Sequence, residues 1–132
     1  MGNIQEPGVA EYEVNDKAYE GLCDCDLENG VLSISINYDG VFVNESINIS
    51  VGDSNFYAIY NHAGDIEPER FTAYPIKQEL KLNLSDFSVG DTIVGELVFK
   101  GISIVEYLKD IKKLNLPIRG NFSCIIGKKE KR

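Results

Sequence analysis

The segment from residue 31 to residue 51 alternates apolar and polar side chains, which is the pattern of β-strands with one buried face. At its centre is the dipeptide Asp39-Gly40, and both residue types tolerate the positive φ that a tight two-residue hairpin turn requires. The sequence therefore predicts a hairpin in which Tyr38 lies opposite Val41. In this register the apolar residues of both arms share one face.

Glu45 interrupts this pattern, because the predicted register places it among the inward-facing residues, opposite Ile34. A β-bulge or a position at a sheet edge explains such a charged residue. The alternative is a buried carboxylate with a functional role. We favour the bulge or the edge position.

The same period of two predicts further strands at 9–14, 17–23, 56–60, 79–84, 92–100 and 118–126. Asn15-Asp16 is the predicted turn between the first two. Gly95 lies inside a strand that is apolar on both faces, and it predicts a bulge or a close approach of two backbones.

The period changes after Ser103, where the spacing of apolar residues becomes helical. Ser103 and Glu106 have the spacing of a capping box, and Pro117 stops a helix from continuing. The sequence predicts a short helix over 104–114. The alternative is that the preceding strand extends through Ile102 and Ile104 and is followed by a basic loop.

These elements predict a mostly β fold, an antiparallel β-sandwich or half-open barrel of about seven or eight strands with one short helix near 104–114. A chain of 132 residues is long enough for one domain with its own core. We expect a single β-rich domain over 1–127 and a basic tail over 128–132.

Cysteine and histidine content argues against a disulfide framework and against a zinc site. The three cysteines are Cys23, Cys25 and Cys124, and we expect them to be reduced, small residues in or near the core. Alternatively, Cys124 bonds one of the other two and leaves an odd thiol. His62 is the single histidine, so no second nitrogen ligand exists for zinc.

Calcium is considered because acidic residues cluster near a turn, at Asp24, Asp26 and Glu28. The stretch departs from a calcium-binding loop, since glycine falls one place late and Ser35 stands where a bidentate Glu is needed. We expect no metal and no other cofactor.

Charge is distributed very unevenly along the chain. Residues 1–69 contain fourteen carboxylates and one cation, Lys17, whereas residues 70–132 contain seven carboxylates and twelve cations. Such a separation favours electrostatic steering of a cationic partner. The net charge of −8 disfavours direct binding of nucleic acid.

Several functional classes lack support in the sequence. There is no phosphate-binding loop, dinucleotide fingerprint or nucleophile motif, and His62 has no partner in a catalytic triad, so we expect a protein that is not an enzyme. No apolar run is long enough to span a membrane, and no basic, apolar leader begins the chain, so we expect a cytoplasmic location unless a signal peptide has been removed.

The longest stretch without a period, residues 61–75, is predicted to be a loop, and aromatic residues surround it. We take this loop and the acidic turns as the candidate partner-binding surface. The candidate residues are Asp24, Asp26, Glu28, Asp65, Glu67, Glu69, Tyr60, Phe71 and Tyr74.

The end of the chain contains the stretches GELVFKG (95–101) and IRGNFSCII (118–126), the latter with an I-x-G-x-F core. This last third of the chain resembles the C-terminal strands of small β-rich Bacteroidetes proteins of unassigned function. The resemblance implies a cell-surface location for proteins that carry a lipoprotein signal. It assigns no functional residue.

The sequence thus predicts a non-catalytic acidic binding protein. Its sharpest form is an immunity or inhibitor protein that engages a basic toxin or nuclease. The alternative is a surface-associated, ligand- or carbohydrate-binding β-sandwich that uses the aromatic loop 56–75.

Overall fold

The computed structural model describes residues 7–64, 70–107 and 110–128, and these parts contain eight β-strands and no helix. The strands are β1 (Val9–Val14), β2 (Lys17–Glu28), β3 (Val31–Asp39), β4 (Val43–Val51), β5 (Phe56–Gly64), β6 (Arg70–Leu82), β7 (Thr92–Tyr107) and β8 (Asp110–Lys128).

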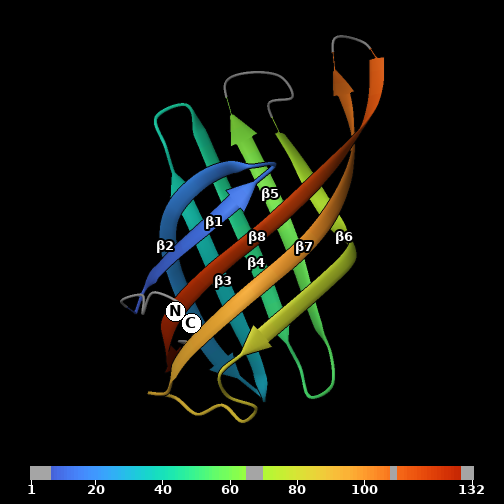
Figure 1. The fold of residues 1–132 in the computed structure, drawn as a ribbon. Coiled ribbons are helices and arrows are strands. Elements are labelled where there is room, and N and C mark those ends of the chain that lie inside the picture. The colour runs from blue at the N-terminus through green and yellow to red at the C-terminus, as the bar shows by residue number, and fades with distance from the viewer. Residues whose placement is uncertain (1–6, 65–69, 108–109, 129–132) are drawn as a thin grey trace.

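Each strand pairs antiparallel with the next, and β1 also pairs with β8, so the sheet closes on itself as a barrel (Figure 1). β1 is short, and next to it β2 and β8 meet directly in a parallel pairing that begins at Cys25 and Ile126. The predicted mostly β, antiparallel fold is confirmed. A sandwich or a half-open barrel is not confirmed, because one sheet contains all eight strands and its first and last strands pair.

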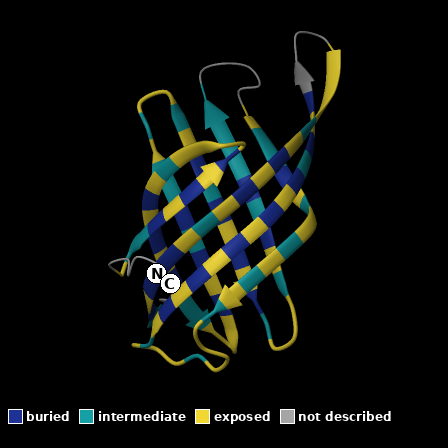
Figure 2. Cartoon of the chain, viewed as in Figure 1, coloured by how far each residue is buried: buried dark blue, intermediate teal, exposed yellow. Residues whose placement is uncertain are grey.

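Alternation along each strand sends one set of side chains inward and the other outward, as the banding in Figure 2 shows. The interior is filled by apolar residues from every strand. Gly95 faces inward, where an added Cβ would collide with the ring of Phe122. The atoms that crowd Gly95 belong to side chains, so the predicted close approach of two backbones is not what the structure shows. The pairing of β7 with β8 continues past Gly95 without a bulge.

The predicted helix over 104–114 is absent. β7 and β8 instead pair with each other through this region and extend past their other neighbours, as a two-stranded hairpin (Figure 1). Ser103 and Val105 are buried while Ile104 is exposed, which is strand periodicity. Cross-strand pairing outweighs the local capping signal, because a partner strand is available at this point. The alternative extension of the strand is correct, but a second strand replaces the basic loop.

The predicted hairpin exists as β3 and β4, with a different turn and register. Tyr38 pairs with Glu45 rather than Val41, so the second arm is shifted by four residues. An even shift leaves the residues of β4 on their expected face. Val41, which was predicted to face inward, lies between the two strands and is 89% exposed. The positive φ values of two-residue turns occur at Asn15-Asp16, as predicted, and at Asn29-Gly30. Asp39-Gly40 does not have them.

The predicted loop over 61–75 is largely strand. β5 continues to Gly64 and β6 begins at Arg70, and only residues 65–69 between them lie outside the described residues. Tyr60 pairs with Ala73, which extends regular pairing into the stretch where the sequence shows no period. Asn61, His62 and Thr72 are only partly buried, so burial alone does not mark these strands.

β6 changes partner along its length. It pairs with β5 from Arg70 to Ala73 and with β7 from Tyr74 onward, and an irregularity follows at Pro75. Past this point the side chain of Gln78 connects β6 to β5. The Ala58 N–H donates to Gln78 Oε1 over 3.0 Å, and Gln78 Nε2 donates to the Phe56 carbonyl over 3.1 Å. The amide side chain thus replaces backbone pairing.

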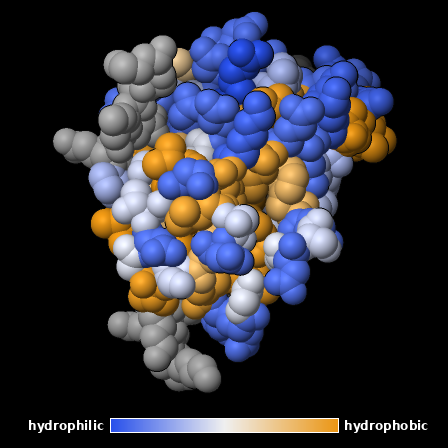
Figure 3. All heavy atoms as spheres, turned by 60° about the horizontal axis from the view of Figure 1, so that its bottom comes forward, coloured by the Kyte–Doolittle hydropathy of each residue, from blue (hydrophilic) through white to orange (hydrophobic). Residues whose placement is uncertain are grey.

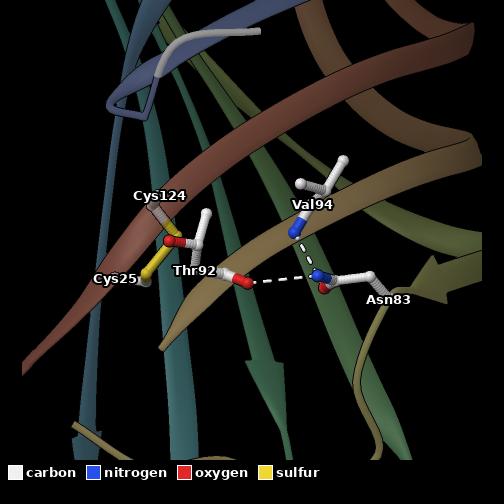
Figure 4. The surroundings of a disulfide bond; sticks show 5 residues. All are labelled: Cys25, Asn83, Thr92, Val94 and Cys124. Carbon is white, nitrogen blue, oxygen red and sulfur yellow. Dashed lines mark hydrogen bonds between the residues drawn. A yellow bond between two sulfur atoms is a disulfide. The ribbon is translucent and has the colours of Figure 1, made fainter. Parts of the chain in front are cut away.

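Two of the cysteines are bonded, which corrects the expectation of three reduced residues. Cys25 on β2 and Cys124 on β8 form a disulfide with a Cα–Cα distance of 6.0 Å, at the place where β2 and β8 meet (Figure 4). Cys23 remains a buried thiol. Burial, and next the neighbouring Asp24 carboxylate, raises the pKa of the Cys23 thiol to about 12, which keeps it protonated at neutral pH.

Candidate functional site

A single row of inward-facing residues crosses four strands near one end of the barrel. The register places Tyr38, Glu45, His62 and Phe71 directly opposite one another on β3, β4, β5 and β6. Glu45 is the centre of this row, and its side chain is only 2% exposed. The expectation of a bulge or an edge position for Glu45 is wrong, because β4 pairs regularly on both sides of it.

Three groups compensate the burial of the Glu45 carboxylate. The Tyr12 hydroxyl donates to Oε1 over 3.0 Å, and the Tyr60 hydroxyl donates to Oε2 over 2.5 Å. His62 Nδ1 lies 3.2 Å from Oε2. A buried carboxylate is tolerated only with such partners. Glu45 therefore links β1, β4 and β5 through the interior.

The two tyrosines act as neutral hydrogen-bond donors. Burial raises the pKa of both hydroxyls well above the usual range, and the Glu45 carboxylate raises them further through its charge and its hydrogen bonds. A proton leaving either tyrosine would place two negative charges together in the interior.

Aromatic rings surround this carboxylate. Phe71 stacks on His62 with a centroid distance of 4.8 Å, and Tyr12 stacks on Tyr19 at 5.2 Å. Tyr38 packs its edge against Tyr19 at 4.9 Å. Because both Glu45 oxygens accept hydrogen bonds, the cluster fixes strands relative to one another.

The outer face of β2, β1, β8 and β7 carries a second row, which is acidic. Glu20 pairs with Glu11, Glu11 with Asn121, and Asn121 with Glu96. These four residues are called the acidic row. They line an open groove of about 780 Å³ together with Glu13 and Arg119.

Further carboxylates extend this surface along β2. Asp24 and Asp26 follow Glu20 on the outward side of the strand, and with Glu11, Glu13, Glu20 and Glu96 they form what we call the acidic face. Within the described residues, none of these six forms a salt bridge with a Lys or Arg.

The structure describes three of the six predicted acidic residues. Asp24, Asp26 and Glu28 lie on β2, as expected for one surface. Asp65, Glu67 and Glu69 lie outside the described residues. Gly64 and Arg70, which flank them in sequence, are at the opposite end of the barrel from Glu28 (Figure 1).

The three predicted aromatic residues do not form one surface. Tyr60 is 1% exposed and belongs to the Glu45 cluster. Phe71 faces inward on His62, whereas Tyr74 is exposed on the outside of β6, opposite Ile102. The residues that sequence reasoning missed are Glu11, Glu13, Glu20 and Glu96. The alternation along 9–14 places Glu11 and Glu13 on the outer side, as observed, but it gives no reason to select them as binding residues.

A third feature is a polar hollow of about 530 Å³ on the outside of β3, β4, β5 and β6. Its outward-facing residues form two adjacent cross-strand rows, Asn37, Ser46, Asn61 and Thr72 in one and Asp39, Asn44, Ala63 and Arg70 in the other. The Thr72 hydroxyl donates to Asn61 Oδ1 over 2.7 Å. Most of these side chains are neutral hydrogen-bonding groups.

Within the described ranges, no group of three or more His, Cys, Asp and Glu side chains is arranged to hold a metal ion. The same residues contain no helix suited to crossing a membrane. A comparison with protein-family models found no match, and searches of curated proteins and of solved structures found none either.

Proposed function

We propose that this chain is a non-catalytic binding protein whose acidic face engages a basic protein, in the manner of an immunity or inhibitor protein that neutralises a toxin or nuclease. The observation that carries the proposal is the direct opposition of Glu11 and Glu20 across β1 and β2. Both side chains are exposed, and no described cation pairs with them.

Like charges opposite each other destabilise a sheet, by the few tenths to about 1 kcal/mol that opposite charges contribute there. A cationic group between Glu11 and Glu20 would convert this repulsion into attraction. The same charges act at longer range, because a surface of one sign raises association rates with a partner of the other sign. In the free protein the repulsion between Glu11 and Glu20 lowers stability, and binding of a basic partner removes this repulsion.

The test uses the isosteric variant E11Q/E20Q/E96Q and, as a probe, a synthetic peptide of alternating Lys and Ser. We expect the peptide to bind the unmodified protein with an affinity that falls steeply as salt rises. The variant should bind at least about tenfold more weakly, which corresponds to about 1.4 kcal/mol. Titration calorimetry at low salt and at about 0.15 M ionic strength measures both effects.

The matched control is D53N/E79Q/D86N, which removes the same number of exposed carboxylates from other positions. Its affinity should stay within about twofold of the unmodified protein. Equal weakening by both variants would show that net charge alone matters, and the proposal would be abandoned. Capture from native lysate, compared between the two variants, then identifies basic proteins that depend on the acidic face.

The disulfide bears on where such a protein acts. Bonds of this kind persist in oxidising compartments and are rare in the cytosol. The Cys25–Cys124 bond therefore supports an extracytoplasmic place of action over the cytoplasmic location expected from sequence.

A second candidate function is binding of a neutral, hydroxyl-rich ligand such as a saccharide. The aromatic loop on which this idea rested is divided between two strands, but the polar hollow favours it by a different route. Asn61 and Thr72 are already joined by a hydrogen bond, which pre-organises them. Binding at this hollow would be insensitive to salt, unlike binding at the acidic face.

A further inference from the structure

Exposed apolar side chains lie on the same outer face as the acidic row. Two positions along each strand from the acidic row, the register aligns Leu22, Val9, Ser123 and Val94 on β2, β1, β8 and β7. Leu22, Val9 and Val94 are called the apolar row, and Ser123 between Val9 and Val94 is a buried polar residue, 1% exposed. Ile125 follows Ser123 on the same face of β8.

The apolar side chains at the two ends of this row are open to solvent. Leu22 is 64% exposed and Val94 is 45% exposed, and the neighbouring Ile125 is 55% exposed. Figure 3 looks toward the end of the barrel that is lowest in Figure 1 and shows apolar side chains among hydrophilic ones on that face. Half-buried Val9 and buried Ser123 separate Leu22 from Val94 in the register. Exposed apolar groups beside polar ones are a feature of interaction sites.

The backbone under this surface is held in place. The Val94 N–H donates to Asn83 Oδ1 over 2.9 Å, and Asn83 Nδ2 donates to the Thr92 carbonyl over 3.1 Å (Figure 4). The nearby Cys25–Cys124 disulfide fixes β8 against β2. A surface fixed in this way loses little conformational entropy when a partner binds.

We infer that the apolar row and the acidic row form one docking surface for a segment of a basic protein that presents an aliphatic side chain beside its Lys or Arg residues. The inference rests on the proposed function and adds the apolar anchor to it. Charge complementarity selects this occupant, because the carboxylates next to Leu22 and Val94 repel an anionic surface and a second acidic copy alike.

The two rows have separate roles in this scheme. Carboxylates at the rim of an interface mainly change the association rate and its salt dependence. Apolar groups that become fully buried mainly change the dissociation rate, and a few of them carry most of the binding energy. The apolar row therefore determines mainly the dissociation rate of the partner, and the acidic row determines mainly its association rate.

The test compares two peptides of equal length and charge, alternating Lys and Leu or alternating Lys and Ser, by surface plasmon resonance. We expect the unmodified protein to prefer the Leu peptide by about tenfold, through slower dissociation. L22T/V94T/I125T should lose this preference while keeping the same salt dependence. Threonine suits exposed strand positions, so these substitutions should leave the fold intact.

The control is I76T/I104T/I111T, which changes three exposed apolar residues elsewhere on the outer surface and should keep the preference. Equal binding of the two peptides, or an equal loss in the control, would overturn the inference. A dimer in sedimentation that disappears in L22T/V94T/I125T would also overturn it, because the occupant would then be a second copy.

Failure of the inference is distinguishable from failure of the proposed function. If E11Q/E20Q/E96Q weakens both peptides and L22T/V94T/I125T changes neither, only the apolar anchor is wrong. If E11Q/E20Q/E96Q has no effect on either peptide, the acidic face itself is not a binding surface.

Discussion

Glu45 is a carboxylate in an interior that is otherwise almost entirely apolar. Among the buried residues that the structure describes, Glu45 is the only one with a charged side chain, counting Asp, Glu, Lys and Arg. Tyr12 and Tyr60 approach it from two different strands, and the hydroxyl of each donates a hydrogen bond to the carboxylate. Such a network is stable when every member is satisfied and costly when one is removed.

Replacement of Glu45 by Ala should lower the free energy of unfolding by about 2–5 kcal/mol, because two buried hydroxyls lose their acceptor. The triple variant Y12F/E45L/Y60F should recover most of this loss, since it removes donors and acceptor together. Urea denaturation followed by circular dichroism measures both. A triple variant no more stable than Glu45→Ala would show that packing, rather than hydrogen-bond satisfaction, determines the cost.

Alkaline pH should destabilise the protein through the same tyrosines. Their pKa values are raised in the folded state, so below pH of about 10 both states hold these protons and stability does not depend on them. Above that pH the unfolded chain releases the protons and the folded chain retains them. Stability should then fall by about 1.4 kcal/mol per pH unit for each tyrosine.

The measurement is the urea midpoint as a function of pH, compared with Y12F/Y60F. The variant should show a distinctly flatter decline above pH of about 10. A decline equally steep in the variant would place the sensitivity at other groups.

Alternation alone predicts that Glu45 faces inward. It does not predict that the interior contains the hydrogen-bond donors that stabilise a buried carboxylate. Its hydrogen-bond partners lie 33, 15 and 17 residues away in the sequence. A local pattern shows a charged residue on an apolar face, and only the folded barrel shows the donors that satisfy it. Residues that break a local rule in this way are where functional or structural specialisation is expected.

At the level of elements, one side chain connects β5 and β6 beyond the end of their backbone pairing. Gln78 both accepts from the Ala58 N–H and donates to the Phe56 carbonyl, where the two strands no longer pair. Its amide has the same donor and acceptor groups as a peptide bond. This allows β6 to change partner without leaving backbone groups of β5 unsatisfied.

Gln78→Ala should therefore speed hydrogen exchange at the Ala58 amide by at least about tenfold, by removing about 1–2 kcal/mol of local protection. Gln78→Glu is the matched control, because a carboxylate keeps the acceptor for Ala58 and loses only the donor to Phe56. Exchange measured by nuclear magnetic resonance distinguishes the two. Equal acceleration in both variants would mean that the amide of Ala58 is not held by Gln78 Oε1.

Elements with strong alternation were predictable, and those decided by distant pairing were not. The strand at 9–14 and the turn at Asn15-Asp16 follow from local sequence. A capping box lies at the start of the 104–114 segment, but the described residues of this segment form the ends of β7 and β8, which pair with each other. The prediction of the β3–β4 turn was wrong for a similar reason. Ile36 pairs with Ile47 in a register that depends on the neighbouring strands as well as on the turn residues.

For the whole molecule, the fold class followed from the sequence and the closure did not. Pairing of β1 with β8 joins residues more than a hundred positions apart, such as Val9 and Ser123. Closure also decides the candidate surface. It places Glu96 of β7 in one row with Glu11 and Glu20, which the division of charge along the chain does not predict.

The disulfide also determines how this barrel would respond to mechanical force applied at its two ends. Cys25 and Cys124 enclose most of the chain, with a separation of 99 residues. A pull on the ends can extend only the 24 residues before Cys25 and the 8 after Cys124, to about 110 Å in all. Once the bond is reduced, the full chain can be drawn out to about 450 Å. The covalent link thus shields the five strands β3 to β7 from tension applied at the two ends.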